Sequence, residues 1–205
     1  MTNRYSRHDI LLRESYHRIK NHLALIVSTL RLEANAEVGA TSALALRKAA
    51  DRLTAVAELY DLLSVSQIDH SIDVHAYLDR VLDGLRRSIQ DHRPIVMNVY
   101  LDDLTASADL AVRIGILLNE LVSNACKYGR SGDGSLTLDV SLHFADGQAL
   151  LQVADRGPEF GHEATTSTGL GMQIITALVK SLHGRMERAS PSGVLITFPV
   201  AASDA

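Results

Sequence analysis

One of the nine histidines in this chain has neighbours that suit chemistry. Glu14 precedes His17 by three residues and Asn21 follows it by four, so on an α-helix the three side chains share a face. A neutral imidazole nitrogen near pH 7 can attack a phosphoryl group. Glu14 could accept the imidazole proton or fix its tautomer, and Asn21 could orient a water or a phosphoryl oxygen. The spacing predicts a nucleophile at His17, although a solvated helix face explains the adjoining Arg18 and Lys20 nearly as well.

A carboxylate and an amide interrupt an apolar stretch in the middle of the chain. Glu120 and Asn124 are four residues apart, with Asn119 beside them, so on a helix the carboxylate and the second amide share a face. Buried polar side chains need hydrogen-bonding or ionic partners. The pattern indicates a polar ligand at this face, and ordinary polar helix residues are the alternative.

Two glycine-containing turns follow. Gly169-Leu170-Gly171 opens a predicted helix directly after a polar loop, so free backbone N–H groups and the positive helix end would favour a phosphate there. Asp155 follows a predicted strand, and Gly157 would let the backbone approach a ligand closely. Taken alone, each segment is equally consistent with an ordinary polar turn.

The composition excludes several function classes. The chain has 205 residues, a formal net charge of −4 and a pI near 6.1, so it lacks the basic excess of a nucleic-acid-binding protein. Its single cysteine, Cys126, cannot form an internal disulfide, and no charged-then-apolar leader opens the sequence. These features predict a reducing, cytoplasmic setting. The apolar runs are too short to cross a bilayer, so a membrane signal would have to arrive through another protein or a missing segment.

The segment that carries His17 is predicted to be an amphipathic helix over residues 6–36. Its apolar positions recur at spacings of three, four and seven, at Leu12, Ile19, Leu23, Ile26 and Leu30. Thr41 or Ser42 could cap a second helix that continues to about residue 64. Its apolar stripe comprises Leu46, Ala49, Leu53, Val56, Tyr60 and Leu63. The two segments predict an antiparallel hairpin, and a second copy would cover both stripes in a four-helix bundle, which predicts a homodimer.

A polar stretch at residues 65–71 ends this pattern, so the expected domains are residues 1–68 and residues 69–205. In the second part, periodicity and turn residues predict helices at 74–89, 109–128 and 169–182. They predict strands at 95–101, 136–144, 149–154, around Met186 and at 194–198, with a tight hairpin turn at Asp146-Gly147. Helices that cover one face of a largely antiparallel sheet give an α+β two-layer domain.

Together, these segments resemble a sensor histidine kinase of the HisKA_2 family. Residues 14–21 read E-x-x-H-R-x-K-N, like the phosphoacceptor box, and residues 119–125, 155–158 and 168–172 are similar to the N, G1 and G2 boxes of the ATP-binding domain. The related HWE kinases share the phosphoacceptor box, but this chain has no tryptophan and so lacks their Trp-x-Glu signature. The resemblance implies helical hairpins in a dimeric four-helix bundle, followed by a Bergerat-type (GHKL) α/β two-layer sandwich.

The resemblance also implies roles for individual residues. Asn124 matches the Mg²⁺ ligand, and Glu120 matches the position that helps to hold the metal or its water; oxygen ligands suit Mg²⁺. Asp155 matches the group that accepts a hydrogen bond from the adenine amino group. Asn21 matches a position tied to phosphatase activity. The other implied nucleotide contacts are Asn119, Lys127, Tyr128, Gly157, Thr168, Gly169, Leu170 and Gly171, and Thr168 could equally be a helix cap.

One position departs from the family pattern. Glu159 stands where the G1 box usually has a second glycine, and a carboxylate at the mouth of the pocket would disfavour a triphosphate. The segment expected to close over ATP, residues 161–168, is short. Both features bear on the affinity for nucleotide.

The resemblance implies a two-component kinase that autophosphorylates His17 from Mg-ATP and passes the phosphoryl group to an aspartate of a response-regulator receiver. Glu159 leaves open a dimeric histidine phosphotransfer or phosphatase protein with a degenerate ATP site. A serine kinase of the anti-sigma type would have no use for a hairpin that carries His17. No PAS, GAF or periplasmic sensor domain fits within 205 residues, so the signal would come from a separate sensor protein or a missing domain.

Overall fold

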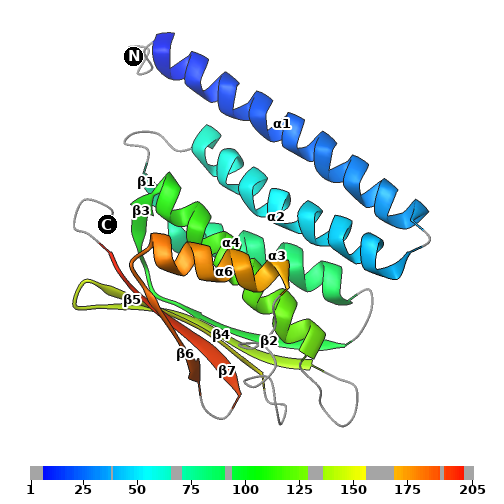
Figure 1. Cartoon of the computed structure of the whole chain (residues 1–205). Coiled ribbons are helices and arrows are strands. Elements are labelled where there is room, and N and C mark those ends of the chain that lie inside the picture. Colours follow the sequence, from blue (N-terminus) through cyan, green and yellow to red (C-terminus); the bar gives the residue numbers. More distant parts are fainter. Residues whose placement is uncertain are drawn as a thin grey trace.

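The computed structural model describes residues 7–37, 39–65, 71–90, 94–128, 136–155, 169–189 and 192–200. The helices are α1 (Arg7–Ala36), α2 (Ala40–Val65), α3 (Val74–Gln90), α4 (Ala108–Tyr128) and α6 (Leu170–Ser181). The strands are β1 (Ser71–Asp73), β2 (Ile95–Leu101), β3 (Thr105–Ser107), β4 (Leu136–Ala145), β5 (Gln148–Asp155), β6 (Arg185–Ala189) and β7 (Gly193–Pro199). Figure 1 shows the α1–α2 pair on one side, the sheet on the other, and α3, α4 and α6 between them.

The N-terminal hairpin forms as its apolar pattern predicts. Helices α1 and α2 lie side by side along their lengths, and the side chains of Ala34, near the turn, and of Ala50, further along α2, are both buried. The prediction that Thr41 or Ser42 caps the second helix is wrong. The backbone N–H of Ala43 donates to the carbonyl of Gly39 at 2.9 Å, so the helix starts earlier and both hydroxyl residues lie within its first turn.

The main sheet is mixed and has the strand order β2-β4-β5-β7-β6. Strand β2 runs parallel to β4, and the other neighbours are antiparallel. Along β4, Leu136, Leu138, Val140 and Leu142 are buried in alternation with less buried residues, as predicted. The predicted turn at Asp146 and Gly147 is confirmed, because their φ angles of 52° and 71° suit the two central positions of a tight β-hairpin.

Strands β1 and β3 form a separate two-stranded antiparallel sheet that the sequence did not predict. Each has only three residues, which is too short for a period-two pattern to be recognised. This small sheet joins the start of α3 to the start of α4, since the N–H of Val74 donates to the carbonyl of Leu104 at 2.8 Å. It thereby fixes how these two helices lie side by side.

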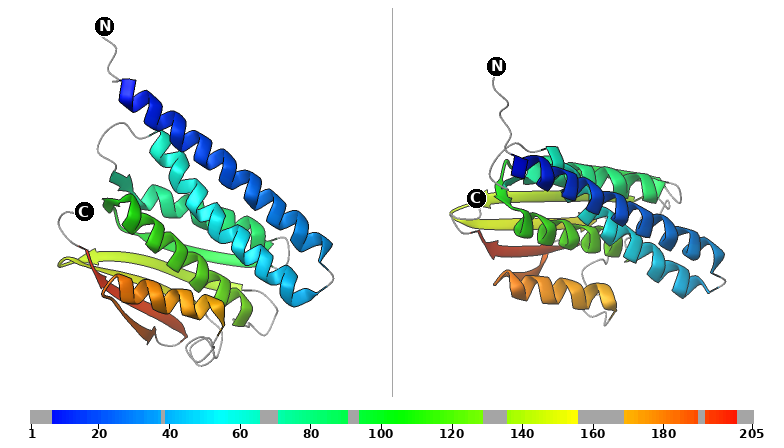
Figure 2. Two further views of the ribbon diagram at one scale, coloured as in Figure 1. Left: turned by 45° about the horizontal axis from the view of Figure 1, so that its top comes forward. Right: turned by 90° about the horizontal axis from the view of Figure 1, so that it is seen from above.

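Helix α2 is docked on the globular part of the chain. Its buried residues Ala55 and Leu59 belong to the same core as residues of α3 and α4. The hydroxyl of Tyr77 in α3 donates to the carbonyl of Ala55 at 3.0 Å, and a Cβ added at Gly115 in α4 would lie 2.3 Å from that hydroxyl. Only glycine therefore leaves room for Tyr77 to reach α2. Figure 2 shows α2 between α1 and the α3–α4 layer, and the division into residues 1–68 and 69–205 stays a prediction.

Candidate functional site

Helix α4 buries two polar side chains on the face that meets the start of α6. The exposed fractions of Glu120 and Asn124 are 1% and 6%, and most of the remaining α4 side chains pack into the core. A Cβ added at Gly171 would lie 2.6 Å from Oε2 of Glu120 and 3.6 Å from Oδ1 of Asn124. The absence of a side chain at Gly171 lets the two helices approach there. The structure thus brings together three of the predicted residues, from segments about 50 positions apart in sequence.

The first turn of α6 is arranged as an open helix end. Gly169 holds the N-cap position in an extended conformation, with φ −68° and ψ 157°, and no side chain of the described residues caps this end. Unpaired N–H groups in the first turn of a helix favour an anion, and phosphate is the usual one. The N-cap is therefore Gly169, and Thr168 lies outside the described residues.

Asp155 is buried at the end of β5, and its two carboxylate oxygens differ in their contacts. Ser192 Oγ donates to Asp155 Oδ1 at 2.5 Å, and the Asp155 N–H donates to the Ser192 carbonyl at 3.0 Å. Among the described residues, nothing donates a hydrogen bond to Asp155 Oδ2. A buried carboxylate oxygen without a donor is costly, so this atom suits a donor group of a ligand. Sequence reasoning missed Ser192, because a serine beside a turn glycine carries no local signal of a partner 37 residues away.

Glu120 is also bound from the hairpin side. Arg52 in α2 donates from Nη2 to Oε2 at 3.0 Å and from Nε to Oε1, which makes a bidentate pair. The neighbouring Asp51 pairs with Arg31 at 3.5 Å. Burial raises the pKa of the Asp51 carboxyl; the Arg31 charge opposes this rise, while the charge of Glu120 adds to it. Sequence reasoning did not single out Arg52, because its partner lies 68 residues away.

Asn119 does not join the Glu120–Asn124 face. It is 2% exposed and lines a small cavity with residues of α1, α2 and α3, among them Arg31 and Asp51. Each residue of a helix is rotated by about 100° from the one before it, so Asn119 and Asn124, five positions apart, point about 140° from each other: Asn119 faces the hairpin and Asn124 faces α6. A nucleotide contact by Asn119 stays a prediction.

His17 is exposed on α1, with Asn21 beside it. Asn21 Nδ2 lies 3.3 Å from His17 Nδ1. Glu14 instead accepts hydrogen bonds from Arg18, at 2.6 Å from Nη2 and 3.2 Å from Nε. The structure therefore pairs the histidine with the amide, and a role for Glu14 at the imidazole stays a prediction.

The turn that carries His17 is fixed to the far end of α2. Lys20 Nζ lies 2.5 Å from Asp61 Oδ1, and the rings of Tyr16 and Tyr60 are 6.0 Å apart. The hydrogen bond from Lys20 is the main cause that lowers the pKa of the Asp61 carboxyl. Lys20 thus ties α1 to α2 in this arrangement.

Two family models match the chain. One, described as histidine kinase and named HisKA_2, matches residues 14–89, and the other, described as histidine kinase-, DNA gyrase B- and HSP90-like ATPase, matches residues 109–202. The chain belongs to the HisKA_2 histidine kinases. The second match and the α+β architecture confirm the predicted GHKL-type fold.

Similar proteins agree with this assignment of the kinase core. The sensor histidine kinase PdtaS of Mycobacterium tuberculosis is 30% identical over a match 209 residues long, gaps included. This match covers 94% of this chain and 40% of PdtaS. Blue-light-activated histidine kinase 2 of Erythrobacter litoralis is 28% identical over 183 residues, 87% of this chain and 53% of that protein. The chain thus spans about half or less of the length of these relatives.

Solved structures support the fold. The histidine kinase domain of Erythrobacter litoralis EL346 aligns over 97% of this chain and 96% of that domain, with a TM-score of 0.67 and 21% identity. The EL346 blue-light-activated histidine kinase aligns over 99% of this chain and 62% of its own, with a TM-score of 0.68 and 25% identity. Among the described helices, none is long and apolar enough to span a membrane.

Several residues expected at the nucleotide site of this kinase core are not described. Lys127 and Tyr128 end helix α4 and Leu170 begins α6, but their side chains lie outside the described part of the structure. Gly157, Glu159 and the expected lid at 161–168 lie wholly outside it. Their predicted roles stay predictions.

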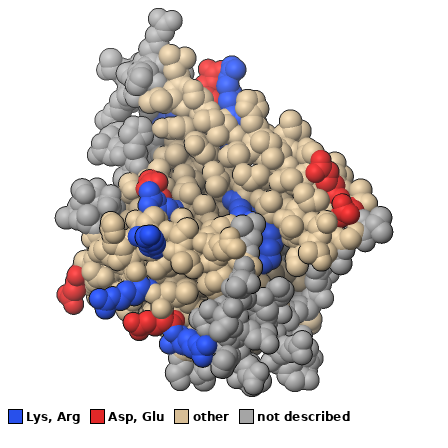
Figure 3. Space-filling model, viewed as in Figure 1, with Lys and Arg blue, Asp and Glu red and all other residues tan. Residues whose placement is uncertain are grey.

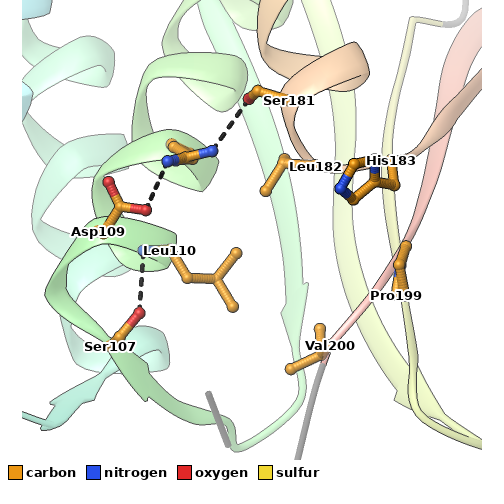
Figure 4. A pocket seen from close by; sticks show the side chains of 9 residues that line it. Ser107, Asp109, Leu110, Ser181, Leu182, His183, Pro199 and Val200 are labelled. Carbon is orange, nitrogen blue, oxygen red and sulfur yellow. Dashed lines mark hydrogen bonds and ion pairs between the residues drawn. The ribbon is translucent and has the colours of Figure 1, made fainter. Parts of the chain in front are cut away.

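A separate cavity of about 300 Å³ lies at the other end of the α4–α6 pair. It is lined by residues from the start of α4, the end of α6 and the end of β7, and Arg113 there pairs with Ser181 and Asp109 at 3.1 and 2.7 Å (Figure 4). None of the predicted nucleotide residues lines it. The candidate site of the histidine kinase core is instead at the end where α4 finishes and α6 starts (Figure 1).

In the view of Figure 3, most of the described surface is uncharged, with Lys and Arg scattered over it and Asp and Glu mainly near its edges. The candidate site is thus defined by buried polar groups and an open helix end rather than by a broad charged surface.

Proposed function

We propose that this chain is the catalytic core of a two-component histidine kinase that autophosphorylates His17 from Mg-ATP and passes the phosphoryl group to an aspartate of a response-regulator receiver. One observation carries the proposal: Glu120 and Asn124, buried in an apolar helix, meet Gly171 at the open end of α6. A carboxylate and an amide beside an anion-binding helix end suit a metal-bound polyphosphate.

The described residues offer a distinct contact to each part of the nucleotide. Asn124 and Glu120 supply oxygen atoms for Mg²⁺ or its waters, and the first turn of α6 supplies N–H groups for the phosphates. The free Oδ2 of Asp155 would accept a hydrogen bond from the adenine amino group. Bound Mg-ATP would supply the phosphoryl group, and its Mg²⁺ would offset the negative charge of the phosphates. These contacts hold and orient the donor, which is the main contribution of a protein to phosphoryl transfer.

His17 performs the nucleophilic step in this proposal. Asn21 Nδ2 can donate only to an unprotonated Nδ1, which leaves the ring proton on Nε2. Attack by Nε2 on the γ-phosphorus therefore requires the tautomer with the proton on Nδ1, which Asn21 would stabilise with its amide turned so that Oδ1 accepts from Nδ1–H. A P–N bond forms, the bond between the γ-phosphorus and its bridging oxygen breaks, ADP leaves, and the imidazole proton passes to a carboxylate or water. A receiver aspartate then displaces the imidazole and takes the phosphoryl group as an acyl phosphate. Asn21 could later orient the water of a phosphatase reaction.

A homodimer is part of the proposal. Leu11, Leu25 and Leu32 of α1 are 54%, 67% and 69% exposed and lie at multiples of seven residues, so they form an apolar stripe, interrupted at Arg18, on the outer face of the hairpin. A second copy would bury this stripe in a four-helix bundle. Sedimentation equilibrium should give twice the chain mass, and Leu25→Asn with Leu32→Asn should give monomers. A monomeric wild-type chain at micromolar concentration would contradict this part.

The remaining parts concern the cellular setting. We expect a cytoplasmic protein whose signal comes from a separate sensor protein or from a domain missing from this sequence. We also expect the hairpin of residues 1–68 and the ATP-binding part of residues 69–205 to act as separate domains. Asn124→Ala should therefore abolish phosphorylation without changing the oligomeric state.

A dimeric histidine phosphotransfer protein is the second candidate, and one contact favours it: Arg52 engages both oxygens of Glu120. One experiment separates the two. The chain is incubated either with Mg-ATP labelled at the γ-phosphate or with a labelled, phosphorylated receiver. The kinase proposal expects acid-labile label from Mg-ATP. Label taken only from the receiver would support the second candidate, and acid-stable label from Mg-ATP would contradict both.

A further inference from the structure

The carboxylate of Glu120 is shared between the hairpin and the nucleotide site. On one side it is bound by the Arg52 guanidinium of α2, and on the other it lies against Gly171 at the start of α6. The pair is well shielded, since the side chains of Arg52 and Glu120 are 17% and 1% exposed. A hydrogen-bonded pair of this kind is strong when water is excluded.

This contact limits the other interactions that Glu120 can make. Both carboxylate oxygens accept hydrogen bonds from Arg52, so neither has its full capacity for a metal-bound water or for a proton. Deprotonating an imidazole or holding the hydration shell of Mg²⁺ would require these same atoms. The arrangement therefore opposes the activity proposed for this face.

The phosphoacceptor helix is held against a different part of α2. Contacts of Tyr16 with Tyr60 and of Lys20 with Asp61 place the turn of His17 beside residues 60 and 61 of α2. Arg52 lies nine residues before Asp61, which corresponds to about 13 Å along a helix. His17 is on α1, and α2 lies between α1 and α4 (Figure 2). The described arrangement thus separates the acceptor histidine from Glu120.

We propose that Arg52 is an autoinhibitory latch: with α2 docked on α4 it occupies Glu120, and undocking of α2 frees the carboxylate for the nucleotide site. This inference rests on the proposed kinase function. Removal of Arg52 leaves Glu120 buried without a counter-charge only while α2 is docked, so the loss destabilises the docked state selectively. A signal that moves the hairpin would activate the kinase by the same route.

The test compares three variants of the whole chain with wild type. Arg52→Gln removes the guanidinium, and Arg52→Lys keeps the charge but loses the bidentate geometry. Arg80→Gln is the matched control, because Arg80 of α3 pairs with Asp61 of α2 at 3.0 Å and does not contact Glu120. Each protein is assayed for the initial rate of acid-labile phosphorylation, for Mg-ATP affinity, and for hydrogen exchange in residues 50–60.

We expect Arg52→Gln to raise the rate about tenfold, to tighten Mg-ATP binding and to speed exchange in α2, with Arg52→Lys between it and wild type. Arg80→Gln should change the rate by less than about twofold. A rate in Arg52→Gln equal to or below wild type, or an equal rise in Arg80→Gln, would overturn the latch. If neither wild type nor any variant is phosphorylated, the kinase proposal fails. The latch is then judged by hydrogen exchange and Mg-ATP affinity alone, and an Arg52→Gln protein that matches wild type in both would overturn it.

Discussion

Replacing Asp155 by asparagine tests the nucleotide site at a single atom. The substitution keeps the shape of the side chain, and the asparagine Oδ1 can still accept the hydrogen bond that Ser192 donates at 2.5 Å. The free, buried Oδ2 becomes an amide NH₂, which is a donor. A donor facing the adenine amino group replaces an attractive contact by a repulsive one. The change should therefore act on the base and leave the fold intact.

The expected loss follows from the strength of the contact. A hydrogen bond to a charged group contributes about 1.5–3 kcal/mol, so ATP should bind roughly 10- to 150-fold more weakly to Asp155→Asn. Inosine triphosphate carries a carbonyl in place of the amino group and can accept from the new amide. Its affinity should fall less than that of ATP or rise.

Calorimetric titration of both nucleotides with Mg²⁺ into wild type and variant measures the effect. Asp102→Asn is a suitable control, because Asp102 lies near the end of β4 away from Asp155 and accepts from the Phe144 N–H at 2.9 Å. It should leave both affinities unchanged. An unchanged ATP affinity in Asp155→Asn, or an equal loss for both nucleotides, would refute the assignment of Asp155 to the adenine amino group.

Four further substitutions test packing and charge. Gly171→Ala would place a methyl group 2.6 Å from Glu120 Oε2 and should weaken ATP binding by about tenfold, and an unchanged titration would contradict the close approach. Gly115→Ala would place a methyl group 2.3 Å from the buried hydroxyl of Tyr77 and should lower the free energy of unfolding by about 1–3 kcal/mol in urea titrations. Gly84→Ala is the control, because no atom lies within 4 Å of the added methyl group, and it should raise the free energy of unfolding by up to about 1 kcal/mol. Burial raises the pKa of Asp51, so its ionised form costs stability at neutral pH; the cost shrinks as the pH falls through the raised pKa and is gone below the ordinary value of 3.8. Asp51→Asn should therefore raise the melting temperature at pH 7 but not below pH 3.8, and an equal shift at both pH values would contradict this.

Local patterns in the sequence were sufficient for the elements and for part of the site. The alternation in β4 and the Asp146-Gly147 turn depend on residues next to each other in the chain, and both are as predicted. Glu120 and Asn124 share a face because helical geometry alone requires it. The start of α2 was misplaced, since hydroxyl residues inside the first turn look the same in sequence as a cap.

Contacts between distant segments could not be read from the sequence. Ser192 binds Asp155 across 37 residues and Arg52 binds Glu120 across 68, and no spacing rule joins such partners. The parallel pairing of β2 with β4 is likewise set by how α4 crosses the sheet. Glu14 shows a local competition, because Arg18 one turn later is a stronger partner for its carboxylate than a neutral imidazole.

The central claim is that His17 receives the γ-phosphoryl group of ATP, and locating the phosphate by mass spectrometry under neutral conditions tests it most directly. The chain is incubated with Mg-ATP and digested without acid, alongside His17→Ala and His22→Ala, the latter a control on an exposed histidine of the same helix. We predict phosphate on the peptide that contains His17 in wild type and in His22→Ala, and none in His17→Ala. Acid-labile phosphate that persists in His17→Ala, or phosphate on another residue in wild type, would contradict the account.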